Sequence, residues 1–136
     1  MNEVFADTFF YLALLSRDAS SRARASEAAR SIHAHVVTTA YVLLELANSL
    51  SGVANRPSYL ALARRLRTSR HVTVVPASQD LFDQGEALYA ARPDKDWSLT
   101  DCISFVVMRD RGISDALTGD HHFEQAGFTA LLETQA

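Results

Sequence analysis

The sequence predicts an α/β fold of the doubly wound type, in which helices cover both faces of a parallel sheet. Short apolar segments of strand type alternate with helical segments from one end of the chain to the other. The strand segments lack a regular alternation of polar and apolar residues, which is typical of parallel strands buried on both faces. With 136 residues the chain is long enough for one domain with a substantial core, and we expect that domain to span residues 1–136.

The N-terminal part of the chain is expected to contain two strands and two helices. Residues 3–6 form a short apolar segment that predicts a buried strand, and residues 8–16 form an apolar-rich helical segment. Residues 20–33 are rich in Ala, Arg, Glu and Ser, a composition that favours a second helix facing solvent. Residues 36–38 predict the second strand.

The middle of the chain predicts two helices and a third strand. A helix over residues 39–51 ends near Gly52, because glycine commonly follows the last helical turn. Proline suits the first turn of a helix, so Pro57 marks the start of the next helix, which runs to about Ser69. The β-branched residues of 72–75 predict the third strand.

The C-terminal part continues the same alternation. Residues 78–91 predict a helix that ends before Pro93, and residues 98–111 predict another that ends at Gly112. A strand, a short helix and a last strand complete the expected order, at residues 113–118, 121–126 and 128–132.

Composition excludes several classes of protein. No apolar stretch approaches the roughly 20 residues that a membrane-spanning helix needs. The first residues lack the basic and apolar regions of an export signal, so we expect a cytoplasmic protein without a membrane partner. Cys102 is the single cysteine and lies among apolar residues, which favours an inert core thiol. The net charge is −3, but arginines concentrate in residues 22–30 and 64–70, either as phosphate-binding stripes or as solvated helix faces.

Four carboxylates lie at the end of an apolar segment or inside one, where an unpartnered charge is costly. Asp7 and Asp120 follow the first and fourth expected strands, Asp101 lies in the first turn of a helix, and Glu45 lies inside the helix after the second strand. In doubly wound folds the functional crevice lies outside the C-terminal ends of the strands, so all four side chains can face one cleft.

A cluster of this kind predicts a metal site. Two carboxylates 4 Å apart repel by about 4 kcal/mol at an effective dielectric near 20, and a divalent cation removes that repulsion. Hard oxygen ligands favour Mg²⁺ or Mn²⁺.

Three of the four acids also have a structural explanation. Asp7 can cap the following helix, and Asp101 can form a capping box with Ser98. Asp120 can be a turn residue, whereas Glu45 has apolar neighbours and would be a core glutamate without a partner, which is rare. The joint pattern of four acids at strand or helix ends favours the metal site.

Other polar side chains near the crevice carry less weight. Thr8, Thr39 and Thr118 can offer hydroxyl groups there or serve structure alone. His121 and His122 are adjacent, so we expect them to point apart and to form a poor metal pair. A surface position is favoured for both, with a place near the cleft as the alternative for one of them.

In order and spacing these residues resemble the PIN-domain family, specifically its VapC-type toxin ribonucleases. Four segments carry the resemblance: Ala6-Asp7-Thr8, Val42-Leu43-Leu44-Glu45-Leu46-Ala47-Asn48, Asp96-Trp97-Ser98-Leu99-Thr100-Asp101-Cys102-Ile103-Ser104-Phe105 and Ala116-Leu117-Thr118-Gly119-Asp120-His121-His122-Phe123. The resemblance implies a three-layer α/β/α sandwich with a five-stranded parallel sheet. It also implies Mg²⁺- or Mn²⁺-dependent cleavage of RNA phosphodiester bonds by the toxin of a type II toxin–antitoxin pair.

The same resemblance implies partners and site residues. The expected partners are an RNA substrate, a small antitoxin protein that blocks the cleft, and a second copy of the chain in a homodimer. By position, Asp7, Glu45, Asp101 and Asp120 correspond to the family's catalytic and metal-binding acids, with Asp7 and Asp101 as the principal ligands.

Three alternatives to a nuclease fit the sequence to different degrees. A catalytically weak PIN-fold protein that binds RNA or protein remains open. A signalling receiver domain needs a phosphoacceptor aspartate after the third strand and a lysine after the fifth, but Pro76 follows the third strand and no lysine follows Lys95. A hydrolase with an Asp-x-Asp nucleophile is disfavoured because Phe9 stands where the second acid would be.

Overall fold

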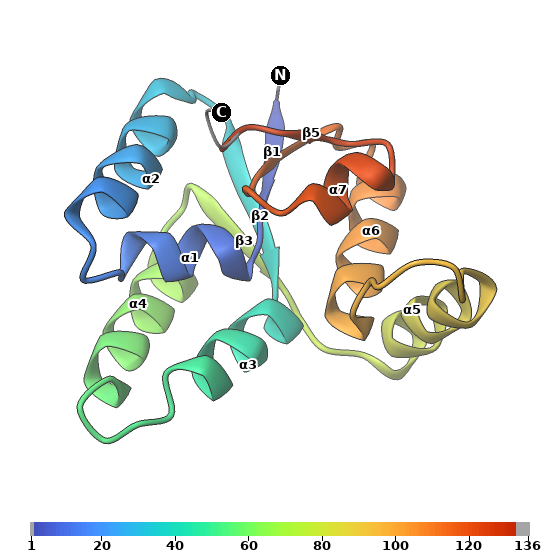
Figure 1. The fold of residues 1–136 in the computed structure, drawn as a ribbon, viewed down its shortest axis with the longest axis horizontal. Coiled ribbons are helices and arrows are strands. Elements are labelled where there is room, and N and C mark those ends of the chain that lie inside the picture. The colour runs from blue at the N-terminus through green and yellow to red at the C-terminus, as the bar shows by residue number, and fades with distance from the viewer. Residues whose placement is uncertain (1, 133–136) are drawn as a thin grey trace.

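The computed structural model describes residues 2–132, which form a five-stranded parallel sheet between two layers of helices (Figure 1). The strands are β1 (Glu3–Ala6), β2 (His35–Thr39), β3 (Val72–Val75), β4 (Asp115–Leu117) and β5 (Thr129–Ala130). The helices in these residues are α1 (Thr8–Leu14), α2 (Ala19–Ser31), α3 (Ala40–Ser49), α4 (Arg56–Thr68), α5 (Gln79–Ala91), α6 (Leu99–Arg111) and α7 (His121–Gln125). The predicted α/β sandwich with a five-stranded parallel sheet is confirmed, and the extent of the domain, 1–136, stays a prediction.

The strand order β3-β2-β1-β4-β5 determines where the two helical layers lie. The chain runs outward from β1 through β2 to β3, then returns past β1 to β4 and β5. Right-handed crossovers in opposite directions place the connecting helices on opposite faces. Figure 1 shows α1 to α4 on one side of the sheet and α5 to α7 on the other. The strand order therefore reverses between β1 and β4, which is where such folds form their crevice.

Local signals in the sequence place most helix ends. Asp7, Ser78 and Ser98 each cap a helix by accepting a hydrogen bond from a backbone N–H. Gly112 ends α6 with φ 67°, a left-handed conformation that glycine adopts without strain. The predicted strand at 113–118 is shorter in the structure, because Thr118 N–H donates to Ala116 O at 3.0 Å and turns the chain directly after β4.

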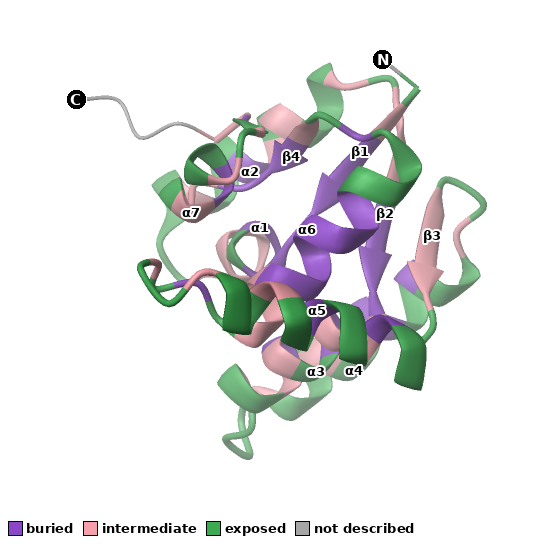
Figure 2. Ribbon diagram, turned by 90° about the vertical axis from the view of Figure 1, so that its right-hand side faces the viewer, coloured by how far each residue is buried: buried purple, intermediate pink, exposed green. Residues whose placement is uncertain are grey.

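The core is built around α6, which lies between α5 and the sheet (Figure 2). Seven consecutive residues of this helix, 102–108, are buried, including Cys102 as expected. A helix segment buried on all sides must be largely apolar all round, and residues 102–108 meet that need with Ser104 as the polar exception. Gly85 of α5 packs against Ile103 of α6 so closely that a Cβ atom there would overlap the isoleucine side chain. In the described part of the chain, no helix is both long and apolar enough to cross a membrane.

Candidate metal centre

Two of the predicted acids lie just beyond the C-terminal ends of two neighbouring parallel strands, at the same edge of the sheet. Ala6 in β1 pairs with Leu117 in β4, and Asp7 directly follows Ala6. Asp120 follows Leu117 after Thr118 and a glycine, and it caps α7. The pairing of β1 with β4 therefore brings the two acids to the C-terminal edge of the sheet, at the point where the strand order reverses.

Asp7 is the most buried of the acids, with 6% of its surface exposed. Its Oδ1 accepts a hydrogen bond from Phe10 N–H at 3.2 Å, and its Oδ2 accepts one from the Thr118 hydroxyl at 2.9 Å. Burial raises the pKa of Asp7 from 3.8 to about 8, against the opposite effect of these two bonds, and the charges of Asp120 and Asp101 add to the rise. A carboxylate so placed needs a proton or a cation.

Asp101 faces the same space from the first turn of α6. Its Oδ2 accepts from Ser98 N–H at 3.1 Å and lies 3.2 Å from His122 Nδ1, which donates to it when His122 is the Nδ1–H tautomer. Burial raises the pKa of Asp101, and the charge of Asp120 adds to the rise. No described residue donates a hydrogen bond to Asp101 Oδ1, so that oxygen is available to a ligand.

Thr118 links the two strand-end acids. Its hydroxyl donates to Asp7 Oδ2 and accepts a 3.0 Å hydrogen bond from Asp120 N–H. Asp120 Oδ1 in turn accepts from His122 N–H at 2.9 Å. Thr118 is fully buried, so this bridge is shielded from water and sets the relative orientation of Asp7 and Asp120. The sequence suggested a hydroxyl near the crevice, but nothing in it indicated that Thr118 would join two acids.

Glu45 is placed less directly. Its helix, α3, packs against α1 and α6, the two helices whose first turns present Asp7 and Asp101. Among the described residues, no hydrogen bond or ion pair joins its carboxylate to the other three acids. Glu45 is half-buried, so the expectation of a core glutamate is wrong: the side chain reaches solvent and needs no buried partner. Its membership of the site stays a prediction.

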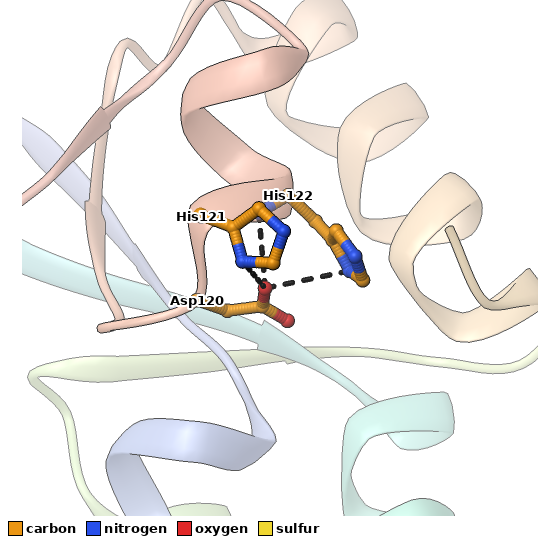
Figure 3. Close-up of side chains that lie close together, drawn as sticks. All are labelled: Asp120, His121 and His122. Atoms are coloured by element: carbon orange, nitrogen blue, oxygen red, sulfur yellow. Dashed lines mark hydrogen bonds and ion pairs between the residues drawn. The ribbon is translucent and has the colours of Figure 1, made fainter. Parts of the chain in front are cut away.

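The two histidines differ from the sequence expectation. Their ring centroids are only 4.5 Å apart, and both Nδ1 atoms approach Asp120 Oδ1 (Figure 3), at 3.8 Å for His121 and 3.4 Å for His122. Side chains of a helix tilt toward its N-terminus, and Asp120, His121 and His122 are the cap and first two residues of α7. All three therefore lean over the same end of the helix. His121 is exposed as expected, but His122 is not, with 20% of its side chain exposed.

The three aspartates suit a hard divalent cation. The capping bonds occupy part of each carboxylate, and each carboxylate offers about four lone-pair positions, so acceptor capacity remains on all three. Thr8 Oγ1, one residue after Asp7, is buried without a hydrogen-bond partner among the described residues. Burial and the charge of Asp120 raise the pKa of both Asp7 and Asp101, and Mg²⁺ and Mn²⁺ prefer carboxylate oxygens as ligands.

The chain is similar to known proteins in both sequence and structure. Residues 4–129 match the family model of the PIN domain. The chain is 30% identical over 128 residues to the 23S rRNA-specific endonuclease VapC20 of two Mycobacterium tuberculosis strains, and the match covers 94% of this chain and 97% of the relative.

Comparison with solved structures also finds similar proteins. The crystal structure of M. tuberculosis VapC20, described as a sarcin–ricin loop cleaving toxin, matches with a TM-score of 0.83 and 29% identity over 93% of this chain and 96% of that one. FitAcB from Neisseria gonorrhoeae has the same fold, with a TM-score of 0.63 and 18% identity over 93% of this chain and 94% of that one.

Proposed function

Because this chain belongs to the PIN-domain family, we propose that it is a metal-dependent endoribonuclease, the VapC-type toxin of a type II toxin–antitoxin pair. The observation that carries the proposal is the convergence of Asp7, Asp101 and Asp120 at the reversal of strand order, with Asp7 desolvated and its pKa raised to about 8. Structural caps alone do not require the charge of a third acid, Asp120, to raise the pKa of both Asp7 and Asp101.

Asp7 and Asp101 are the proposed principal ligands of Mg²⁺ or Mn²⁺. Asp120 and Glu45 orient that ion, hold a second one or position the attacking water. A bound dication supplies charge neutralisation at the scissile phosphate and lowers the pKa of a coordinated water.

The remaining residues fix the carboxylates in place. Thr118 and Phe10 N–H hold both oxygens of Asp7, while Ser98 N–H and His122 hold one oxygen of Asp101. A ligand set held in this way is preorganised, so little reorganisation is needed when substrate binds.

Looped RNA is the substrate class that the proposal favours. The relative VapC20 is named for 23S rRNA and is described as cleaving the sarcin–ricin loop. Loops expose backbone and unstacked bases that can enter a crevice, whereas a continuous helix does not. Arginine side chains at the rim of the site would bind the RNA phosphates.

We also propose two protein partners, an antitoxin and a second copy of the chain, and a cellular location. An antitoxin that inserts a cationic side chain between the aspartates would pair with the same oxygens that bind the ion, and so would block the site. A homodimer and a cytoplasmic location complete the proposal.

The test is cleavage of a sarcin–ricin loop hairpin and of unstructured RNA with Mn²⁺. Wild type should cleave at least one of them, chelation by EDTA should stop the reaction, and Asp7→Asn should lower the rate by at least a hundredfold. Asp110→Asn, which removes an exposed acid near the other end of α6, is the matched control and should retain wild-type rates. Equal cleavage by wild type and Asp7→Asn would reject the assignment, whereas RNA binding without cleavage would favour an interaction module.

A further inference from the structure

Asp120, His121 and His122 offer one carboxylate oxygen and two imidazole nitrogens within 4.8 Å of one another (Figure 3). The nuclease proposal uses Asp120 as an oxygen ligand and His122 as a positioning group, and it assigns nothing to His121. The side chain of His121 is 72% exposed, yet its ring lies beside that of His122 rather than extending away from it.

The spacing of the donor atoms fits a single shared ion. Two donors bound to one ion at about 2.1 Å in tetrahedral directions lie about 3.4 Å apart. Asp120 Oδ1 lies 3.4 Å from His122 Nδ1 and 3.8 Å from His121 Nδ1. All three donors lie within 4.8 Å of one another, and the exposed His121 ring has room to move closer to the other two.

We propose that Asp120, His121 and His122 form a binding site for a transition-metal dication of the Zn²⁺, Co²⁺ or Ni²⁺ class. Imidazole nitrogen selects this class over Mg²⁺, which prefers oxygen ligands throughout. Three protein ligands leave a fourth position open to water or a phosphate oxygen. The ligand atoms come from the carboxylate and imidazole side chains, and the backbone at the start of α7 supplies none.

The position of this site gives it a regulatory consequence, and that consequence rests on the proposed nuclease function. Asp120 is shared with the all-oxygen site, and His122 Nδ1 is the atom that lies within hydrogen-bond distance of Asp101 Oδ2, at 3.2 Å. An ion held by Asp120, His121 and His122 therefore withdraws one acid from the all-oxygen site and removes a hydrogen bond from another. We expect Zn²⁺ to inhibit Mg²⁺- or Mn²⁺-dependent cleavage.

Binding can be measured apart from activity, with Co²⁺ as the spectroscopic probe and Zn²⁺ in calorimetry, on full-length protein without a histidine tag. The Asp7→Asn background disables the all-oxygen site, so the remaining binding reports on the histidines. In that background His121→Ala and His122→Ala should each weaken Co²⁺ and Zn²⁺ binding at least tenfold. His33→Ala, at an exposed histidine elsewhere, should bind as its parent does.

The outcomes separate the two proposals. Absence of Co²⁺ binding in the Asp7→Asn background, or equal binding by the histidine variants and their parent, would overturn the site. If His122→Ala fails to fold, His121→Ala decides, because truncation of that exposed ring leaves the core intact. Where wild type cleaves RNA, His121→Ala should need at least fivefold more Zn²⁺ for half-inhibition, and equal sensitivity would overturn the regulatory role. If wild type cleaves no RNA but binds Co²⁺ through both histidines, the nuclease proposal fails and the metal site stands.

Discussion

Replacement of Asp7 by Asn should stabilise the metal-free protein while abolishing its response to Mn²⁺. Asparagine has nearly the same shape as aspartate. Its Oδ1 can still accept from Phe10 N–H, and its amide can donate to the Thr118 hydroxyl. The substitution therefore removes the charge and keeps the packing, so the cost of burying the carboxylate disappears.

The magnitude follows from the pKa of Asp7, which rises from 3.8 to about 8 in the folded protein. Below about pH 4 both the folded and the unfolded chain hold the proton, and Asp7 carries no penalty. As the pH rises toward 8 the unfolded chain loses the proton and the folded chain keeps it, so stability falls. At 1.36 kcal/mol per pKa unit the ceiling of this penalty is about 6 kcal/mol, and relaxation of a real buried site reduces it to about 2–4 kcal/mol.

Thermal unfolding at pH 5 and pH 8, with EDTA and with Mn²⁺, measures this effect. For a chain of this length 1 kcal/mol corresponds to about 3–4 °C in Tm, so Asp7→Asn should unfold about 6–16 °C higher than wild type at pH 8 in EDTA. The difference should shrink at pH 5. Mn²⁺ at about 100 times its Kd should stabilise wild type by about 2.7 kcal/mol and leave the variant unchanged. A destabilised variant, or one that Mn²⁺ still stabilises equally, would refute the reasoning.

Three further substitutions test the structure around the acids. Thr118→Val removes the hydroxyl that bridges the two strand-end acids. We expect it to lower the free energy of unfolding by about 1–3 kcal/mol and the rate of RNA cleavage at least tenfold. Thr68→Val, at an exposed threonine that bonds only its own helix, is the control and should leave cleavage unchanged in the same assay. Ser98→Ala removes the cap of α6 and should lower the free energy of unfolding by about 1 kcal/mol and weaken Mn²⁺ binding. Ser78→Ala removes the equivalent cap of α5 and should lower Tm by the same amount without changing the Mn²⁺ affinity measured by calorimetry. Equal Mn²⁺ affinities for the two variants would contradict this. Gly85→Ala should lower the free energy of unfolding by about 1–3 kcal/mol in denaturant titration because its methyl group overlaps α6, and an unchanged midpoint would show that the α5–α6 contact is looser than described.

The sequence could predict the fold and the positions of the aspartates at strand and helix ends because these signals are local. Alternation of strand and helix segments fixed the class, and Asp7 and Asp101 follow from strand ends and capping patterns within a few residues. Capping and metal binding first stood as rival explanations of these acids. The structure shows that Asp7 caps its helix through Oδ1, and that Asp101 completes its capping box through Oδ2 and keeps Oδ1 available. The two roles are therefore compatible.

Side-chain direction is what the sequence could not supply. Adjacent residues on a regular helix diverge, but His121 and His122 begin α7 and tilt together over its cap. Thr118 bridges two acids only because β4 ends in a tight turn that aims its hydroxyl at Asp7. Half-burial of Glu45 depends on how α3 lies against α1 and α6, which apolar neighbours in sequence do not reveal.

The central claim is that the carboxylates at the ends of β1 and β4 and at the start of α6 bind one divalent cation together. A crystal soaked in Mn²⁺ tests it most directly, by anomalous diffraction from the ion. We predict a peak about 2–2.5 Å from carboxylate oxygens of both Asp7 and Asp101, absent from crystals of Asp7→Asn treated in the same way. A map without a peak at these oxygens, in crystals where Mn²⁺ binds elsewhere, would contradict the account.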